Sequence, residues 1–219
     1  KKTYRDIVEN YYYDNQNRFS RMEYIDPTFS QTTTVTAYDA TNNPTEYFVR
    51  TTGTTIVSKY NATYDAQGRT LSIERRDSTN STTYTLASTF SFSYVGNKQI
   101  RTNTIPGSPT SSSLEQTYGA DGNFLESRFT NFAGVLTTTF NWSGYDTKNS
   151  YEPLLPHILR SGLLPSKNNQ TTEVFTNVVT GVTNTYTATH LYNADNYVTQ
   201  TTYSGVTTPL VYNYTYEKR

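Results

Sequence analysis

Polar and apolar residues alternate with a period of two along several stretches of the chain. The stretch 89–94 reads Thr-Phe-Ser-Phe-Ser-Tyr, and the stretches 136–142, 185–192 and 212–216 alternate in the same way, with Thr138 and His190 among their otherwise apolar or aromatic positions. This alternation is typical of antiparallel strands with one buried face and one wet face. The sequence therefore predicts a sheet with an aromatic inner face and an outer face of threonine, serine and charged residues.

Between the predicted strands, a turn sequence recurs at regular intervals. Its clearest copy is Tyr64-Asp65-Ala66-Gln67-Gly68-Arg69, and related copies begin at Tyr13, Tyr38, Tyr118 and Tyr192. The aspartate can accept a hydrogen bond from the backbone two residues on, while the glycine or asparagine tolerates a left-handed conformation. The pattern predicts hairpins closed by a type I turn with a bulge.

Tandem hairpins of this kind indicate one continuous meander. We expect a single all-β domain over residues 1–219, an antiparallel up-and-down sheet of about 13–15 strands. Because twisted sheets of this length cannot stay flat, the meander should curl into a barrel or half-barrel with the aromatic face inward.

One passage interrupts the repeat, and it predicts a short helix near 150–161. Ser150 can cap such a helix, Pro153 fits its first turn and Gly162 can end it. Its apolar residues would share one side of the helix: Leu154, Leu155, Ile158 and Leu159. We expect this helix to plug the curled sheet.

Composition supports a folded β protein and narrows its partners. The chain has 42 threonines and 21 tyrosines, residue types that suit strands, and 15% of its residues are aromatic. Its 18 basic and 18 acidic residues balance, which argues against nucleic acid as a partner. The absence of cysteine excludes disulfides and thiolate chemistry. The polar outer face argues against a barrel embedded in lipid.

Three features together resemble a known family. These are the Tyr64–Arg69 type of hairpin, the segment Leu163-Leu164-Pro165-Ser166-Lys167-Asn168-Asn169, and the terminal Tyr214-Thr215-Tyr216-Glu217. The chain resembles exported lipoproteins of Bacteroides-type bacteria, a family of unknown function with a porin-like β fold. The hairpin alone also resembles the tyrosine-aspartate repeats of large bacterial shell-forming toxins.

The family resemblance implies export and a location in the periplasm or at the cell surface. It implies an outer-membrane lipid anchor on a cysteine upstream of Lys1, and it brings no catalytic residues. This chain departs from the repeat, since Asn17, Asn43 and Asn196 stand near the glycine position and Val95 replaces the turn aspartate. These departures weaken any interpretation of the repeat as a ligand site.

Catalytic chemistry finds little support in the sequence. The two histidines, His157 and His190, belong to the predicted plug and to an aromatic strand face, and no Gly-x-Ser-x-Gly stretch accompanies them. Hairpin closure explains the regularly spaced aspartates better than paired catalytic carboxylates do. Those residues are Asp14, Asp39, Asp65, Asp121, Asp146 and Asp195. We predict a protein that is not an enzyme and has no metal site or cofactor.

Aromatic residues near the plug are the remaining candidates for ligand binding. Trp142, Tyr145, Tyr151 and Tyr192 could stack on sugar rings, although a purely core role explains them as well. The sequence favours a monomeric envelope lipoprotein that binds a glycan or another envelope protein. The alternatives are a hydrolase acting on polysaccharide and a purely structural envelope protein.

Overall fold

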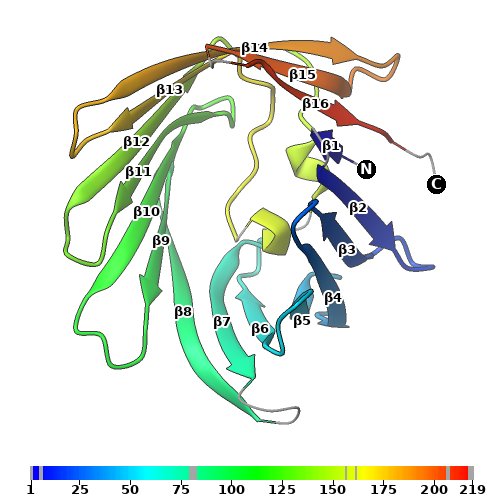
Figure 1. Cartoon of the computed structure of the whole chain (residues 1–219), viewed down its shortest axis with the longest axis vertical. Coiled ribbons are helices and arrows are strands. Elements are labelled where there is room, and N and C mark those ends of the chain that lie inside the picture. The colour runs from blue at the N-terminus through cyan, green and yellow to red at the C-terminus, as the bar shows by residue number, and fades with distance from the viewer. Residues whose placement is uncertain are drawn as a thin grey trace.

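In the computed structural model, the chain is a closed antiparallel β-barrel (Figure 1). The structure describes residues 2–4, 7–78, 83–155, 157–160, 162–205 and 208–216, without the side chains of residues 4, 157 and 158. Within these residues there are sixteen strands. They are β1 (Lys2–Tyr4), β2 (Ile7–Tyr13), β3 (Phe19–Ile25), β4 (Ser30–Tyr38), β5 (Pro44–Thr51), β6 (Val57–Tyr64), β7 (Thr70–Ser78), β8 (Tyr84–Val95), β9 (Lys98–Thr104), β10 (Ser111–Tyr118), β11 (Phe124–Thr130), β12 (Leu136–Ser143), β13 (Thr172–Asn177), β14 (Thr183–Tyr192), β15 (Val198–Ser204) and β16 (Leu210–Tyr214).

The strand order confirms the predicted up-and-down meander. Each strand pairs with its neighbours in sequence, and β1 pairs with β16 to close the sheet, with Lys2 opposite Tyr214. The described strands exceed the expected range by one, because the three-residue β1 shows no alternation in the sequence. Because β1 pairs with β16, the sheet is a closed barrel and not the half-barrel that the sequence also allowed.

The hairpin turns have the predicted geometry. In the best copy, Oδ1 of Asp65 accepts the backbone N–H groups of Gln67 and Arg69 at 3.0 and 2.8 Å. The N–H of Gly68 donates to the carbonyl of Asp65, and Gly68 has a φ of 75°. The pairing register shifts between Thr63 and Tyr64, which is the expected bulge.

Asparagine takes the left-handed position at three of these turns, at Asn17, Asn42 and Asn196. The expectation for Asn43 was therefore wrong by one residue. Asn43 occupies the place of Arg69, and its Nδ2 donates to Oδ2 of Asp39 at 3.0 Å, as the Nε of Arg69 does to Asp65 at 2.7 Å. An amide thus replaces the guanidinium of the consensus turn.

The two faces of the barrel differ in chemistry. Buried apolar residues form two clusters inside it, one around Phe19, Val35 and Tyr47 and the other around Ala62, Ile73 and Phe92. On the alternate positions, which face outward, cross-strand ion pairs join Lys59 to Glu46 at 2.6 Å and Lys98 to Glu115 at 2.8 Å.

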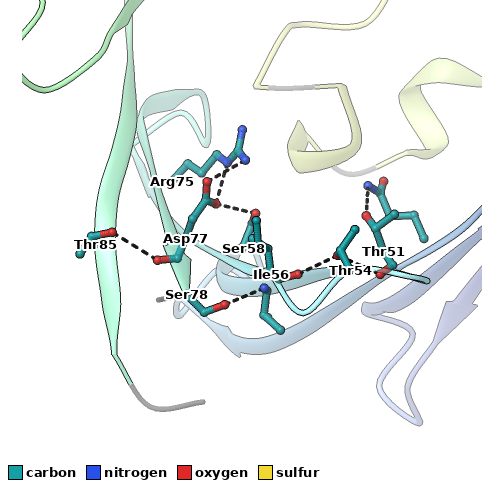
Figure 2. A network of polar contacts seen from close by, with 10 residues as sticks. Thr51, Thr54, Ile56, Ser58, Arg75, Asp77, Ser78 and Thr85 are labelled. Carbon is teal, nitrogen blue, oxygen red and sulfur yellow. Dashed lines mark hydrogen bonds and ion pairs between the residues drawn. The ribbon is translucent and has the colours of Figure 1, made fainter. Parts of the chain in front are cut away.

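Polar groups also line part of the inner wall, where they bond to one another. Figure 2 shows Asp77 of β7 accepting two hydrogen bonds from Arg75, at 2.9 and 2.8 Å, and one from Ser58 of β6 at 2.6 Å. Next to it, the hydroxyl of Ser78 accepts the N–H of Val57 at 2.8 Å. This network joins β6 to β7 through side chains as well as through the backbone ladder.

The segment between β12 and β13 passes through the inside of the barrel, as the prediction of a plug requires (Figure 1). Its helical part differs from the single helix expected near 150–161. The described residues contain two 3-10 helices, η1 (Glu152–Leu154) and η2 (His157–Arg160). Pro156 has no N–H to donate to the carbonyl of Glu152, so a continuous α-helix would lack that bond. Residues 156 and 161 lie outside the described part.

Only part of the predicted apolar side of the plug is buried. Leu159 packs against the first core cluster, whereas Leu154 is 42% exposed. The backbone carbonyl of Glu152 instead accepts the N–H of Leu155 at 3.0 Å and a short bond from the guanidinium of Arg160. No helix in the described residues is long and apolar enough to cross a membrane.

Candidate functional site

A cavity of about 520 Å³ lies inside the barrel, between the plug and the wall formed by β12 to β16 and β1. Five tyrosines line it, and we call it the tyrosine cavity: Tyr151, Tyr186, Tyr203, Tyr212 and Tyr214. Phe140 and Phe175 extend the same aromatic surface. Each of the wall residues occupies an inward position of the alternating pattern, so the strand period itself gathers these rings.

Ring contacts fix the shape of the tyrosine cavity. The rings of Tyr151 and Tyr214 lie 4.7 Å apart between centroids, which joins the plug to β16. The rings of Tyr203 and Tyr212 lie 5.8 Å apart and nearly perpendicular, at 84°. Burial raises the pKa of Tyr203 and of Tyr214 above the ordinary value, so both phenols are neutral hydrogen-bonding groups at physiological pH.

Two carboxylates reach the same cavity. Glu173 on β13 accepts the indole N–H of Trp142 through Oε2 at 2.8 Å. Glu152 in η1 accepts the backbone N–H of Ser166 through Oε2 at 2.8 Å. Burial raises the pKa of Glu152, against the lowering effects of that hydrogen bond and of the charges on Arg160 and Lys2. The two acids therefore have different environments within one cavity.

Lys2 contributes the cationic side chain among the lining residues that the structure describes. Its ammonium lies 5.0 Å from the ring centroid of Tyr212 and 5.8 Å from that of Tyr151. It also pairs with Glu9 at 3.5 Å, on the side facing a neighbouring cavity beneath the plug. The tyrosine faces are thus close enough to an ammonium for cation–π attraction.

His190 is held at the cavity wall by two hydrogen bonds. Its Nε2 lies 2.8 Å from the backbone carbonyl of Gln170, and its Nδ1 lies 3.0 Å from the hydroxyl of Thr201. A carbonyl can only accept, so Nε2 carries a proton and donates. Both ring nitrogens have partners, which agrees with the structural role predicted for this histidine. The side chain of His157 lies outside the described residues.

The four predicted ligand residues are not gathered at one surface. Tyr151 lines the tyrosine cavity, but Trp142, Tyr145 and Tyr192 do not. Trp142 donates to Glu173, and the Tyr145 and Tyr192 hydroxyls make short hydrogen bonds to the Phe124 carbonyl and the Asp146 carboxylate. The bond from Trp142 joins two strands of the wall, whereas those of Tyr145 and Tyr192 tie the segment between β12 and β13 to the wall. Their part in ligand binding stays a prediction.

Sequence reasoning identified most rings of the tyrosine cavity but not that they meet. The alternation marked Tyr186, Tyr212 and Tyr214 as inward residues and Tyr151 was a candidate, whereas Tyr203 was missed and nothing in the sequence placed β16 beside β1 and the plug. Glu152 and Glu173 lie in parts of the chain that are distant in sequence and carry no motif. In the part of the chain that the structure describes, no group of three or more metal-ligating side chains could hold a metal ion.

Comparison with solved structures identifies proteins with a similar fold. No protein-family model matches the sequence, and no curated protein matches it significantly. A porin-like protein from Bacteroides vulgatus aligns with a TM-score of 0.60 at 10% identity, over 94% of this chain and 91% of that one. A porin-like protein from Bacteroides uniformis aligns with a TM-score of 0.59 at 15% identity, over 96% and 90%. The chain has a porin-like β-barrel fold.

Proposed function

We propose that this protein is a cell-envelope barrel that binds a glycan in the tyrosine cavity without chemically altering it. The observation that carries the proposal is the cavity itself, in which aromatic faces surround a few fixed polar groups. Ligand sites typically have volumes of about 300–1,000 Å³ with this combination of surfaces. The cavity of about 520 Å³ falls within that range.

The arrangement of the rings suits a sugar. Tyrosine offers an apolar face for the C–H surface of a pyranose ring and a hydroxyl for its polar edge. In the cavity, the hydroxyl of Tyr203 accepts from Nε2 of Gln170 at 3.2 Å, so the plug orients a wall tyrosine. Rigid aromatic walls of this kind lower the entropic cost of binding, because few rotamers remain to be fixed.

The proposed location follows from the likeness of fold and from the outer face. Both solved structures named above are porin-like proteins of Bacteroides, which supports an envelope location. Ion pairs such as Lys59–Glu46 on the outer wall favour water around the barrel, since a charged residue facing lipid costs about 2–4 kcal/mol at the membrane midplane. We further propose, from the family resemblance alone, that a lipidated cysteine upstream of Lys1 attaches the protein to the outer membrane, facing the periplasm or the exterior.

Polysaccharide hydrolysis is the second candidate, and one observation favours it. Glu152, with its raised pKa, and Glu173 line the same cavity. Two carboxyl groups in different environments are the usual acid and partner of a glycosidase. If the protein is a hydrolase, Glu152 is the general acid and Glu173 is the second carboxylate.

One screen separates these functions. Thermal stability is measured with a panel of envelope and dietary polysaccharides while reducing ends are assayed in the same samples. Binding without catalysis gives a rise in Tm and no products, and Tyr212→Ala abolishes the rise. The matched control is Tyr12→Ala, which removes a tyrosine of the outer wall that bonds Glu23.

Other outcomes contradict the proposal. Release of reducing ends that is lost in Glu152→Gln would establish the hydrolase instead. If no glycan changes Tm, a purely structural envelope protein is the better account. The lipid anchor is tested separately, by the upstream coding sequence and by incorporation of labelled palmitate into the protein in cells.

A further inference from the structure

We infer that the ligand of the tyrosine cavity carries a positively charged amine, so that the glycan class is one rich in unacetylated amino sugars. This inference rests on the proposed glycan binding and specifies its chemistry. The juxtaposition that supports it is two carboxylates that form no ion pair among the described side chains, beside a wall of tyrosine rings.

The first step concerns the partners of the carboxylates. Glu173 accepts a hydrogen bond from the neutral indole of Trp142, and Glu152 accepts one from the neutral backbone N–H of Ser166. Among the described side chains, neither carboxylate forms an ion pair. The nearby Arg160 directs its guanidinium to the backbone carbonyls of Glu152 and Leu163 rather than to a carboxylate. Both acids are thus hydrogen-bonded to neutral donors and make no ion-pair contact, although the charges of Arg160 and Lys2 still act on Glu152.

The second step concerns the available positive charge. Lys2 is the cation among the described residues that line the cavity, and its own ion pair is with Glu9. Its ion-pair contact is therefore with a carboxylate outside the tyrosine cavity, while its charge also lowers the pKa of Glu152. Glu173 is left without either contribution from Lys2 among the interactions described. The negative charges of the two acids reach Tyr203 on β15. Burial raises the pKa of Tyr203 most, and the charges of Glu173 and Glu152 raise it further.

The third step concerns the aromatic rings. Lys2 already places an ammonium 5.0 Å from the Tyr212 ring and 5.8 Å from the Tyr151 ring. These distances lie within the range of about 6 Å for cation–π attraction. The rings of Tyr151 and Tyr212 can also receive an ammonium group of the ligand that enters from the side of Glu173. There the ligand ammonium forms an ion pair with Glu173, which Lys2 does not do.

Alternative ligand charges fit less well. A neutral glycan would exclude water from two carboxylates without replacing it by a counter-charge, which is costly in a partly buried site. An acidic glycan would add repulsion to that cost. An amino sugar supplies both the ring surface for the tyrosines and the charge for the carboxylates.

The experiment compares oligomers of glucosamine with oligomers of N-acetylglucosamine of the same length, by calorimetric titration of the full chain at a pH where the amine is protonated. We expect the glucosamine oligomer to bind about tenfold more tightly or better. In Glu173→Gln this preference should largely disappear, because the glucosamine oligomer loses its ion pair while the acetylated oligomer no longer covers that uncompensated charge and binds as tightly as before or more tightly. Glutamine keeps the size of the side chain and can still accept from Trp142, so folding is preserved. Glu115→Gln on the outer wall is the matched control.

A second variant tests the role of the tyrosine rings and is expected to strengthen binding rather than weaken it. Lys2→Gln removes the resident ammonium, so it should tighten binding of the glucosamine oligomer several-fold, whereas Lys98→Gln on the outer wall should have no effect. Equal or tighter binding of the acetylated oligomer by the unmodified protein would overturn the inference and leave glycan binding intact. If neither oligomer nor any other glycan binds, both proposals fail.

Discussion

Gln99 and Leu164 are joined across the inside of the barrel by a hydrogen bond of 2.9 Å, in which the backbone N–H of Leu164 donates to Oε1 of Gln99. The other end of the same amide, Nε2, donates to the carbonyl of Gly162 at 2.9 Å. Gln99 is fully buried, at 0% exposure. One side chain of β9 therefore satisfies both a donor and an acceptor of the plug, so the position of the plug depends on it.

Replacing Gln99 with leucine should lower the free energy of unfolding by about 3 kcal/mol, because a buried N–H and a buried C=O lose their partners at once. Urea denaturation measures the loss, and amide hydrogen exchange should increase at residues 162–166 before it does in the strands. The control is Gln200→Leu, which removes an exposed hydrogen bond to Asn213. Equal losses in the two variants would show that the plug is held elsewhere.

Gly162 should not tolerate a side chain. It has a φ of 79°, and a Cβ built there would collide with the ring of Phe92. Gly162→Ala should cost about 3 kcal/mol from backbone strain together with overpacking. Gly134→Ala is a matched control, because Gly134 has a similar φ of 75° and no atom near its added Cβ. It should cost about 1 kcal/mol, since only the strain remains.

The turn aspartates should make the protein sensitive to acid. The backbone N–H of Arg18 is the largest cause that lowers the pKa of Asp14, and the hydroxyl of Thr28 has this role for Asp26. A lowered folded pKa gives stability that is present above the ordinary value, near 3.8, and is lost as pH falls through the folded value. Tm should therefore fall steeply below about pH 4.

Asparagine already closes two turns with the same backbone contacts, since Asn131 accepts from Ala133 and Val135, and Asn193 accepts from Asp195 and Tyr197. A variant with asparagine at positions 14, 39 and 65 should thus fold and show a flatter loss of Tm below about pH 4, where the native aspartates take up protons. An unchanged slope would assign the acid sensitivity to other groups.

Glu152 should have the opposite pH dependence. Burial raises its pKa, so the folded protein binds a proton more tightly than the unfolded chain does, and stability falls as pH rises from the ordinary value of 4.5 through the folded value. Glu152→Gln should raise Tm at neutral pH and leave it unchanged near pH 4, about where the unfolded carboxyl titrates. The charged and phenolic groups that face Glu152 are unchanged in the variant: Lys2, Tyr118, Tyr145, Tyr151, Arg160 and Tyr203.

The matched comparison for that prediction is Glu115→Gln, which removes a carboxylate paired with Lys98 on the outer wall. Its Tm should change little at any pH, because exposed ion pairs contribute about 0–1 kcal/mol. A fall in Tm for Glu152→Gln at neutral pH would mean that attraction to Arg160 and Lys2 outweighs the cost of burying the charge.

Local chemistry made the strands and turns predictable. Phe90, Phe92 and Tyr94 face inward as their alternation indicates, and Asp65 and Gly68 close their hairpin as their side chains require. The helix was harder to predict. The leucines around Pro153 have the spacing of an α-helix, but Pro156 has no N–H to donate to the carbonyl of Glu152. A pattern of apolar residues does not by itself distinguish one α-helix from two 3-10 turns.

The site could not be predicted in the same way, because it depends on contacts between distant parts of the chain. Tyr151 comes from the plug, Tyr214 from the last strand and Lys2 from the first. The sequence predicts that Tyr186, Tyr212 and Tyr214 face inward, but it does not predict which rings meet around a cavity. Trp142 was a candidate because of its ring, yet its indole N–H is used to hold Glu173.

The pairing of Lys2 with Tyr214 closes the barrel through two strands at opposite ends of the chain. Every hairpin can form from neighbouring residues, but this last seam requires the longest loop to close, which makes it a slow step in folding. Until it forms, the partly assembled sheet has two unpaired edges that can capture other strands. The tyrosine cavity also takes residues from both sides of this seam, so its wall is complete only once the two exposed edges have been paired.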